Sequence, residues 1–369
     1  MTDRVRLGLV GAGVAAQAIH LPVLHRRPDL FAVTAVCDPS PAAREAVSDR
    51  CGVGSSGRHE RIEELLDAGN VDALLVLSSG SHGGVCARAA AAGLPVFCEK
   101  PLAYTTAEAD ALSAASARVA LGYMKVYDPA VRRAAELLAG RTPRSVEVTV
   151  LHPPAAVQLA DQRIVPGADI PAARRAELER EEQQLLERAL GPAPAAARDL
   201  YRWKILGSIV HDLAVVRALA GEPVGWDRVD AWPVGELASV ALDGVLPDGA
   251  RLSVRWHFLA EYPAYREDVR VHHEQGTVQV TFPSPFLQLP SATLTVVDCD
   301  GGRPRTSRLT SAKNPFEEEL AAFHGFVTKG KPTEAGIVAG RADIVTCQRA
   351  LKRYCELTGL PVGGEALAA

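Results

Sequence analysis

The sequence predicts an α/β protein of two domains, the first built on a parallel sheet and the second on a large, mostly antiparallel open sheet. Length is the first observation behind this prediction, because 369 residues exceed the usual size of a single domain. The second is that apolar runs alternate with helical patterns up to about residue 125. The third is that residues 226–310 alternate strand patterns with turns. We therefore expect domains at 1–125 and 126–369.

Five apolar runs are expected to form the strands of the first domain. They are RLGLVGAG at 6–13, AVTAVCD at 32–38, ALLVLSS at 73–79, PVFCEK at 95–100 and ARVALGY at 117–123. Helical patterns lie between them at 42–50, 62–69 and 84–93. Since strands buried on both faces are uninterruptedly apolar, the alternation predicts a parallel sheet covered by helices on both sides.

The second domain begins with a helix after Asp128-Pro129 and a strand near 144–151. Residues 153–200 are rich in proline and alanine around a charged helical stretch, and form an insertion, a lid or an interaction arm; a solvated surface helix is the simplest interpretation. A helix is expected over about 201–219, and two helices close the chain. Turn signals separate the strands of 226–310 at Asp243-Gly244, Pro247-Asp248-Gly249, Gln275-Gly276 and Gly301-Gly302.

Composition excludes several classes of protein. The formal charge of −4, without a local Lys/Arg block, argues against a nucleic-acid or membrane-surface binder, since both favour a basic face. The seven cysteines are scattered without metal-ligand spacing, so we expect no metal site and structural thiols in a reducing compartment. No signal peptide and no apolar stretch of about 20 residues is found. A cytoplasmic location is expected.

A glycine-rich turn follows the first predicted strand and opens a helix. Gly11 permits a tight turn, Gly13 lets the backbone approach a pyrophosphate, and Ala16 replaces the third, packing glycine. The pyrophosphate would rest on the helix N-terminus at Val14 and Ala15. This strand–turn–helix order predicts a Rossmann dinucleotide-binding domain.

Asp38 ends the second predicted strand, 25 residues beyond Gly13. A carboxylate at this position accepts hydrogen bonds from ribose hydroxyls and repels a 2′-phosphate, which favours NAD over NADP. The alternative is that Asp38 is simply a turn residue before Pro39. NAD is the expected cofactor, with NADP as the alternative.

Together these segments resemble the Gfo/Idh/MocA family, named after glucose–fructose oxidoreductase and inositol dehydrogenase. The resemblance rests on GLVGAGVAAQAIHLPVL at 8–24, CDPS at 37–40, SSGSHGGVCARAAAAGLPVFCEKPLA at 78–103 and GYMKVYDPAV at 122–131. It extends over nearly the whole chain. It implies a Rossmann domain followed by an α/β domain whose open sheet often mediates oligomer contacts, and hence a homo-oligomer, dimer or tetramer. It also implies hydride transfer between NAD(P) and a hydroxyl or keto group of a sugar, cyclitol or sugar derivative.

The most specific element of the resemblance is Glu99-Lys100-Pro101. In relatives this lysine lies beside the substrate and the nicotinamide, so Lys100 is expected to be catalytic as well as to contact both molecules. An ammonium group near a carbinol oxygen stabilises developing alkoxide charge or relays a proton. The family's lysine–proline bond is often cis. Other residues are expected beside the cofactor: Ser78, Ser79, His82 and Glu99. For His82 a structural role is an equal alternative.

His211 matches the family's second signature, a histidine on a helix of the second domain. Histidine suits a general base because its ordinary pKa lies near neutrality. The sequence departs from the family here, because Gly207 stands where relatives have an aspartate and Ala214 where they have a further acid. Either Lys204 and Ser208, at i−7 and i−3 from His211, take over, or His211 acts alone with Lys100 beside a solvated Asp212. The third alternative is that the chemistry is lost.

The leading hypothesis is therefore an NAD(P)-dependent dehydrogenase or reductase acting on a sugar-like substrate. Tyr123, Lys125, Lys204 and Ser208 join Lys100 and His211 as candidate substrate-binding residues. A second hypothesis is an NAD-dependent redox-assisted lyase or glycosidase, as found among relatives. A third is a catalytically idle NAD-binding protein.

Overall fold

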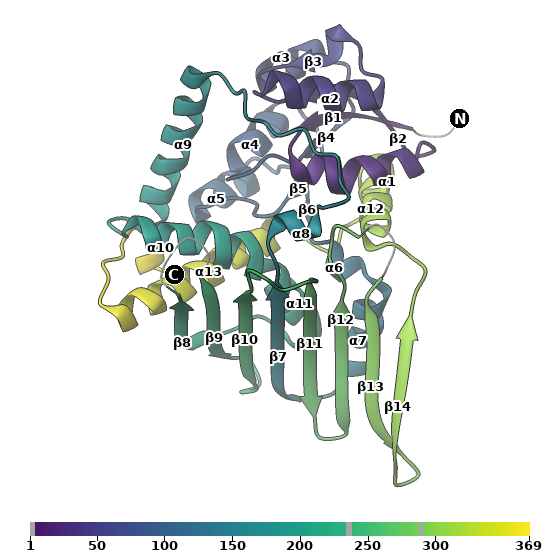
Figure 1. The fold of residues 1–369 in the computed structure, drawn as a ribbon, viewed down its shortest axis with the longest axis vertical. Helices are drawn as coiled ribbons and strands as arrows, with labels where there is room; N and C mark the ends of the chain where they lie inside the picture. Colours follow the sequence, from purple (N-terminus) through teal and green to yellow (C-terminus); the bar gives the residue numbers. More distant parts are fainter. Residues whose placement is uncertain (1–3, 234–237, 288–290) are drawn as a thin grey trace. The chain divides into compact units, whose positions relative to one another are not determined.

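The computed structural model describes residues 4–233, 238–287 and 291–369, which fall into two compact units (Figure 1). Unit 1 consists of the chain up to Tyr123 together with Gln162–Ala189 and Glu319–Ile344. Unit 2 consists of Met124–Asp161, Leu190–Glu318 and Val345–Ala369. The domain limits 1–125 and 126–369 and the role of 153–200 stay predictions.

Unit 1 is built on a six-stranded parallel sheet with the order β3-β2-β1-β4-β5-β6. Its strands are β1 (Val5–Val10), β2 (Phe31–Cys37), β3 (Arg58–His59), β4 (Ala73–Val76), β5 (Val96–Glu99) and β6 (Val119–Gly122). The predicted parallel sheet is confirmed, and the two-residue β3 is an addition too short to show in the sequence. The strand order reverses between β1 and β4, where folds of this kind bind ligands at the carboxyl ends of the strands.

Helices connect these strands, and side chains at their ends explain where they start. The helical elements are η1 (Ala15–His20), α1 (Leu21–Arg26), α2 (Pro41–Cys51), η2 (Ser55–Gly57), α3 (Ile62–Ala68), α4 (Gly83–Ala91), α5 (Thr106–Ala114) and α9 (Ala172–Leu190). Ser40 caps α2 by accepting the Ala43 amide, and Thr105 forms a capping box with Glu108 at α5. The charged stretch of the predicted insertion forms α9, which is mostly exposed except near its end, at Leu186 and Ala189.

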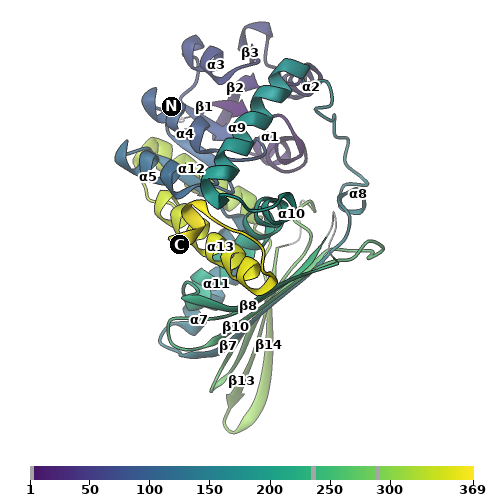
Figure 2. The same ribbon diagram turned by 90° about the vertical axis from the view of Figure 1, so that its left-hand side faces the viewer.

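Unit 2 contains an eight-stranded sheet with the order β14-β13-β12-β11-β7-β10-β9-β8. Its strands are β7 (Pro143–His152), β8 (Gly225–Trp232), β9 (Ser239–Val245), β10 (Arg251–Phe258), β11 (Arg266–His273), β12 (Gly276–Phe282), β13 (Thr293–Asp300) and β14 (Arg303–Thr310). Among the strands of the described residues, only the pair β7–β10 in this sheet is parallel, which confirms the predicted, mostly antiparallel sheet. Apolar residues on alternate positions of the central strands face α7 and α11, which cover one side of this sheet (Figure 2).

The remaining helices belong to unit 2 or are shared. They are α6 (Met124–Tyr127), α7 (Pro129–Leu138), α8 (Ala155–Gln158), α10 (Ala195–Asp199), η3 (Leu200–Ile209), α11 (Val210–Ala220), α12 (Pro315–Lys329), α13 (Ile337–Thr358) and η4 (Gly364–Leu367). Both closing helices, α12 and α13, contribute residues to each unit. No helix in the described part of the chain is long and apolar enough to cross a membrane.

Two local predictions were wrong. Asp243-Gly244 is not a turn but lies inside β9, where a Cβ on Gly244 would come within 2.5 Å of the Gly225 carbonyl oxygen. The glycine is therefore needed for close strand packing, not for a turn. The helix expected over 201–219 begins as the π-helix η3 and becomes α-helical only from Val210, so the α-helical spacing assumed for Lys204 does not hold there.

Candidate functional site

The turn after β1 holds two glycines with different surroundings. Gly11 has a φ of +100°, and a Cβ there would lie 2.4 Å from the backbone nitrogen of Ser78. A Cβ on Gly13 would instead meet no atom within 4 Å. Ala16 is completely buried, as expected of the packing position. The turn thus packs tightly at its first glycine and leaves open space at its second, which fits a bound pyrophosphate.

Asp38 follows β2 and fastens this turn to it. One carboxylate oxygen accepts the Ala12 amide at 2.7 Å and the other accepts the Ser40 amide at 2.8 Å. Burial raises the pKa of Asp38, and these two backbone hydrogen bonds oppose the shift. A carboxylate has about four lone-pair sites, so Asp38 retains acceptor capacity for ribose hydroxyls. Asp38 consequently braces the turn, in addition to any contact with a nucleotide.

The loop after β4 carries Ser78, Ser79 and His82. Ser78 is half-buried and Ser79 is exposed. His82 is buried, and its two ring nitrogens lie 2.6 Å from the carbonyl oxygens of Ser78 and Pro101. The imidazole therefore links this loop to the loop that follows β5. This position favours a structural role for His82.

Glu99-Lys100-Pro101 stands at the carboxyl end of β5, and the Lys100-Pro101 bond is cis. Lys100 is half-buried, and its amide donates to the Glu99 carboxylate at 3.2 Å. The other oxygen of Glu99 lies 2.8 Å from Nε2 of the buried His20. Burial alone would raise the pKa of Glu99, but the hydrogen bond and charge of His20 outweigh it and lower the pKa. Glu99 is thus held as a carboxylate directly behind the catalytic candidate.

Within unit 1, then, the glycine turn, Asp38, the Ser78 loop and Lys100 all follow the carboxyl ends of parallel strands. The residues present fit a nicotinamide dinucleotide: open space at Gly13, an acid after β2, and an ammonium group after β5.

The helix of His211 in unit 2 explains the missing aspartate. In the π-helix η3, a Cβ on Gly207 would lie 2.4 Å from the carbonyl oxygen of Arg202. No side chain fits there without a backbone shift, so an aspartate at this position is excluded by the helix itself. His211 follows, half-buried, in the first turn of α11.

Lys204 and Ser208 both lie against Trp256 of β10. The Lys204 ammonium is 4.5 Å from the centre of the Trp256 ring and 5.5 Å from that of Phe258, and the Trp256 indole donates to the Ser208 hydroxyl at 3.1 Å. Burial, the one cause identified, lowers the pKa of Lys204. His152 lies 5.0 Å from Trp256, and burial lowers its pKa to about 4. This part of unit 2 is aromatic, and the Lys204 ammonium group lies against its rings.

Lys125 is buried in a group of charges. Its ammonium lies 3.0 Å from Asp212 and 2.5 Å from Glu267, and the Tyr265 hydroxyl donates to Glu267 at 2.6 Å. Burial would lower the pKa of Lys125, but the two carboxylates outweigh it and raise the pKa. Burial and the charge of Glu267 raise the pKa of Asp212 well above its usual range. The interpretation of Asp212 as a solvated neighbour was therefore wrong.

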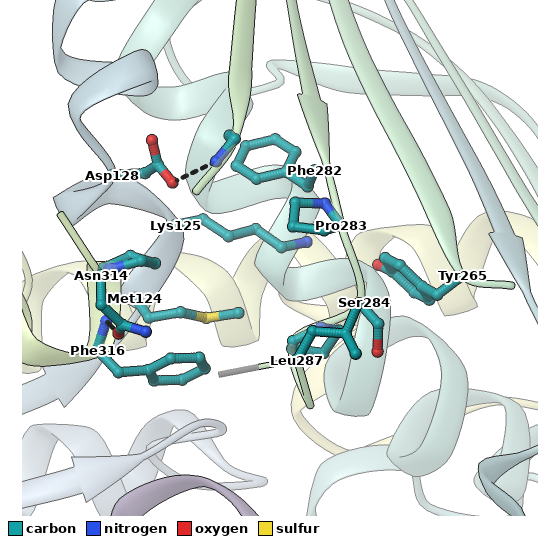
Figure 3. Close-up of a pocket in the computed structure, with 13 residues that line it drawn as sticks. Met124, Lys125, Asp128, Tyr265, Phe282, Pro283, Ser284, Leu287, Asn314 and Phe316 are labelled. Carbon is teal, nitrogen blue, oxygen red and sulfur yellow. Dashed lines mark hydrogen bonds between the residues drawn. The ribbon is translucent and has the colours of Figure 1, made fainter. Parts of the chain in front are cut away.

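Lys125 also lines a hollow that opens to solvent (Figure 3), with about 430 Å³ of empty space when the solvent at its mouth is included. Its ammonium group points toward Tyr265 and lies 5.4 Å from the centre of the Phe282 ring. Tyr123, the neighbouring candidate, is buried, and its hydroxyl donates to Asp343 at 2.6 Å. The structure thus gives Lys125 a solvent-connected pocket and Tyr123 a buried hydrogen bond.

Sequence reasoning missed Asp212 as a buried group and missed Glu267 altogether. Glu267 shares the inward phase of β11 with the buried Val269 and Val271. An acid on the apolar phase of a strand is a signal that could have found it, since an ionised carboxylate is almost never buried unless it is paired.

Comparison with known proteins finds relatives of the N-terminal part of the chain. Residues 5–124 match the model of the Gfo/Idh/MocA oxidoreductase family with an NAD-binding Rossmann fold. Rhizopine catabolism protein MocA of Rhizobium meliloti is 33% identical over 135 residues, which are 35% of this chain and 41% of that protein. The chain thus covers about two fifths or less of the length of the first curated relatives that it matches.

Two longer matches cover most of the chain. Inositol 2-dehydrogenase 2 of Paenarthrobacter aurescens is 26% identical over 295 residues, 75% of each chain. The WlbA dehydrogenase of Bordetella pertussis, solved with NADH and UDP-GlcNAcA, has a TM-score of 0.68 at 16% identity, covering 98% of this chain and 99% of that one. This structure shows the same fold along nearly the whole chain.

The resemblance inferred from Gly11-x-Gly13, Asp38 and Glu99-Lys100-Pro101 is confirmed by these matches. Residues 5–124 are thus similar to the Gfo/Idh/MocA oxidoreductase family with its NAD-binding Rossmann fold.

Proposed function

We propose that this protein is an NAD-dependent oxidoreductase acting on a hydroxyl or keto carbon of a sugar, cyclitol or sugar derivative. The observation that carries the proposal is the open space at Gly13, next to an acid after β2 and on the same sheet edge as Lys100. Curated relatives named inositol 2-dehydrogenase support the cyclitol or sugar class of substrate.

When bound, the nicotinamide accepts or supplies the hydride. In the proposed reaction Lys100 donates a hydrogen bond to the carbinol or carbonyl oxygen and stabilises charge that develops there. We assign His211 as the general base that accepts the proton of the substrate hydroxyl. Because Gly207 leaves no carboxylate to orient the imidazole, Lys204 and Ser208 are the groups of η3 that we assign to the substrate. Lys125 is also assigned to the substrate, because it lines a pocket. Tyr123 is a weaker candidate for substrate binding, because its hydroxyl donates to Asp343.

Asp38 is the reason to propose NAD rather than NADP. Its carboxylate would accept a hydrogen bond from the ribose 2′-hydroxyl, whereas a 2′-phosphate would meet its negative charge. Replacing Asp38 is a poor test, because the same carboxylate holds the Ala12 and Ser40 amides.

The test compares Lys100→Ala with Lys329→Ala, which removes an exposed lysine of the same unit. Wild type and Lys329→Ala should oxidise members of a cyclitol and sugar panel with NAD. Lys100→Ala should lose turnover by roughly a factor of 10³ while binding NADH within about twofold, as expected for a group that acts mainly in the transition state. Unchanged turnover in Lys100→Ala would remove its catalytic assignment.

Gly207 favours a second candidate, an NAD-binding protein without catalysis, because the family's histidine-orienting acid has no room on η3. Tight NADH binding with no turnover on the whole panel would support this candidate. Substrate conversion without net NADH formation would instead indicate the redox-assisted lyase or glycosidase reaction.

Two further properties are proposed with the function. The polar face of the open sheet, which α7 and α11 leave uncovered, would join copies of the chain into a dimer or tetramer. Light scattering of the purified protein measures this directly. We also propose a cytoplasmic location, which cell fractionation tests.

A further inference from the structure

A segment of the predicted insertion lies close to the proposed dinucleotide site of unit 1. The Gln17 side chain forms two hydrogen bonds with the backbone of Val165, donating to its carbonyl and accepting its amide, both at 2.9 Å. A Cβ on Gly167 would lie 3.4 Å from Cβ of Ser40. The chain just before α9 therefore follows the first helix and the start of α2, as the path beside α2 in Figure 2 shows.

Asp169 in this segment contacts the N-terminus of α2. One oxygen of its carboxylate accepts the Ser40 hydroxyl and the other accepts the Ala42 amide at 2.9 Å. The hydrogen bond from Ser40 lowers the pKa of Asp169, with smaller contributions from the Ala42 amide and the charge of Arg44. A carboxylate thus accepts the first free amide of an eleven-residue helix, where the helix dipole favours an anion.

Ser40 links Asp169 to Asp38 of the proposed cofactor site. Its amide donates to Asp38 at 2.8 Å, while its hydroxyl donates to Asp169, so the two carboxylates share one residue. Arg44 is also close, since its guanidinium donates to the Asp38 carbonyl at 2.5 Å. A hydroxyl, a helix N-terminal amide and a guanidinium are the donors that bind phosphate. In this chain the hydroxyl and the amide already hold the Asp169 carboxylate, and the nearby charge of Arg44 lowers its pKa.

We propose that Asp169 is a second determinant of cofactor choice: its carboxylate occupies the anion position beside Asp38 that the 2′-phosphate of NADP would need. The inference rests on the dinucleotide site of the proposed function and deepens it. Asp38 repels the 2′-phosphate, and Asp169 withholds the donors that would otherwise bind it. Discrimination against NADP is therefore divided between the Rossmann strand β2 and the inserted segment.

The experiment measures dissociation constants of NADH and NADPH by nicotinamide fluorescence on the full chain. Asp169→Asn removes the charge, and Glu179→Gln removes an exposed charge of α9 as the matched control. Asp169→Asn should bind NADPH about tenfold more tightly and NADH within about twofold, because one like charge leaves the phosphate position. Glu179→Gln should match wild type for both. Adding Arg44→Ala to Asp169→Asn should abolish the gain in NADPH affinity.

Unchanged NADPH affinity in Asp169→Asn, with NADH still bound, would overturn the inference and leave the proposed function intact. Equal weakening of both cofactors would also overturn it, since Asp169 would then only hold the segment in place. A wild-type chain that binds neither cofactor would overturn the proposed function itself and the inference with it. Thermal unfolding midpoints of the variants within about 2 °C of wild type establish that each is folded.

Discussion

Gly13 stands just before the helix that follows β1, Gly207 lies within η3, and the surroundings of the two glycines are opposite. A Cβ on Gly13 would enter open space, whereas one on Gly207 would strike the Arg202 carbonyl at 2.4 Å. The first glycine leaves room for something outside the chain, and the second is required by the helix's own backbone. The same residue type thus lies at the proposed dinucleotide site in unit 1 and, in unit 2, at the position where the family resemblance implies a carboxylate.

The two regions also differ in how their charges are satisfied. Lys100 of unit 1 is half-buried at the end of a strand beside a carboxylate that His20 holds. Lys125 of unit 2 is buried between Asp212 and Glu267. The difference teaches that two lysines near family motifs need not have the same role: Lys125 is held by two buried carboxylates, and only Lys100 is proposed as a catalyst.

The largest effect is expected at Lys125. Lys125→Met leaves Asp212 and Glu267 buried without their cation, and should reduce the free energy of unfolding by about 3–5 kcal/mol. Urea unfolding measures it, with Lys313→Met as the control at an exposed lysine of the same unit. Adding Glu267→Gln should restore part of the loss. Equal stability of Lys125→Met and wild type would show that the buried charges are not coupled.

Gly207→Ala comes next. The new Cβ meets a backbone oxygen that can move only with η3, so the free energy of unfolding should fall by about 1–3 kcal/mol. Gly13→Ala, the matched substitution at the open glycine, should change it by less than about 0.5 kcal/mol. A Gly207→Ala variant as stable as wild type would mean that a side chain fits on η3, and the account of the missing aspartate would fail.

A smaller effect concerns His152. Its pKa is lowered from 6.5 to about 4, so the unfolded chain binds more protons between these pH values. The free energy of unfolding should therefore fall by about 1–2 kcal/mol as the pH drops from 7 to 4.5, after allowing for the partial exposure of the ring. His152→Gln should lack this component. Parallel pH dependences of the two proteins would contradict the buried, neutral state of His152.

The sequence predicted most of unit 1 because glycine spacing, strand ends and the Glu99-Lys100-Pro101 motif are local signals. It predicted the strands of unit 2 but not that Gly244 lies inside one, since glycine is typical of turns as well as of close strand contacts. The partners of Lys125 could not be predicted, because Asp212 and Glu267 lie 87 and 142 residues away in sequence. Asp169 is hidden for the same reason, since its contact with Ser40 spans 129 residues.

The most direct test of the central claim is an NADH titration of wild type and Gly13→Val, followed by nicotinamide fluorescence. Gly13 is not among the glycines with positive φ, so valine changes the open space and not the backbone conformation. We predict saturable NADH binding to wild type and an affinity at least about tenfold lower for Gly13→Val, at an unchanged unfolding midpoint. Equal NADH affinities of the two proteins would contradict the assignment of this turn to the dinucleotide.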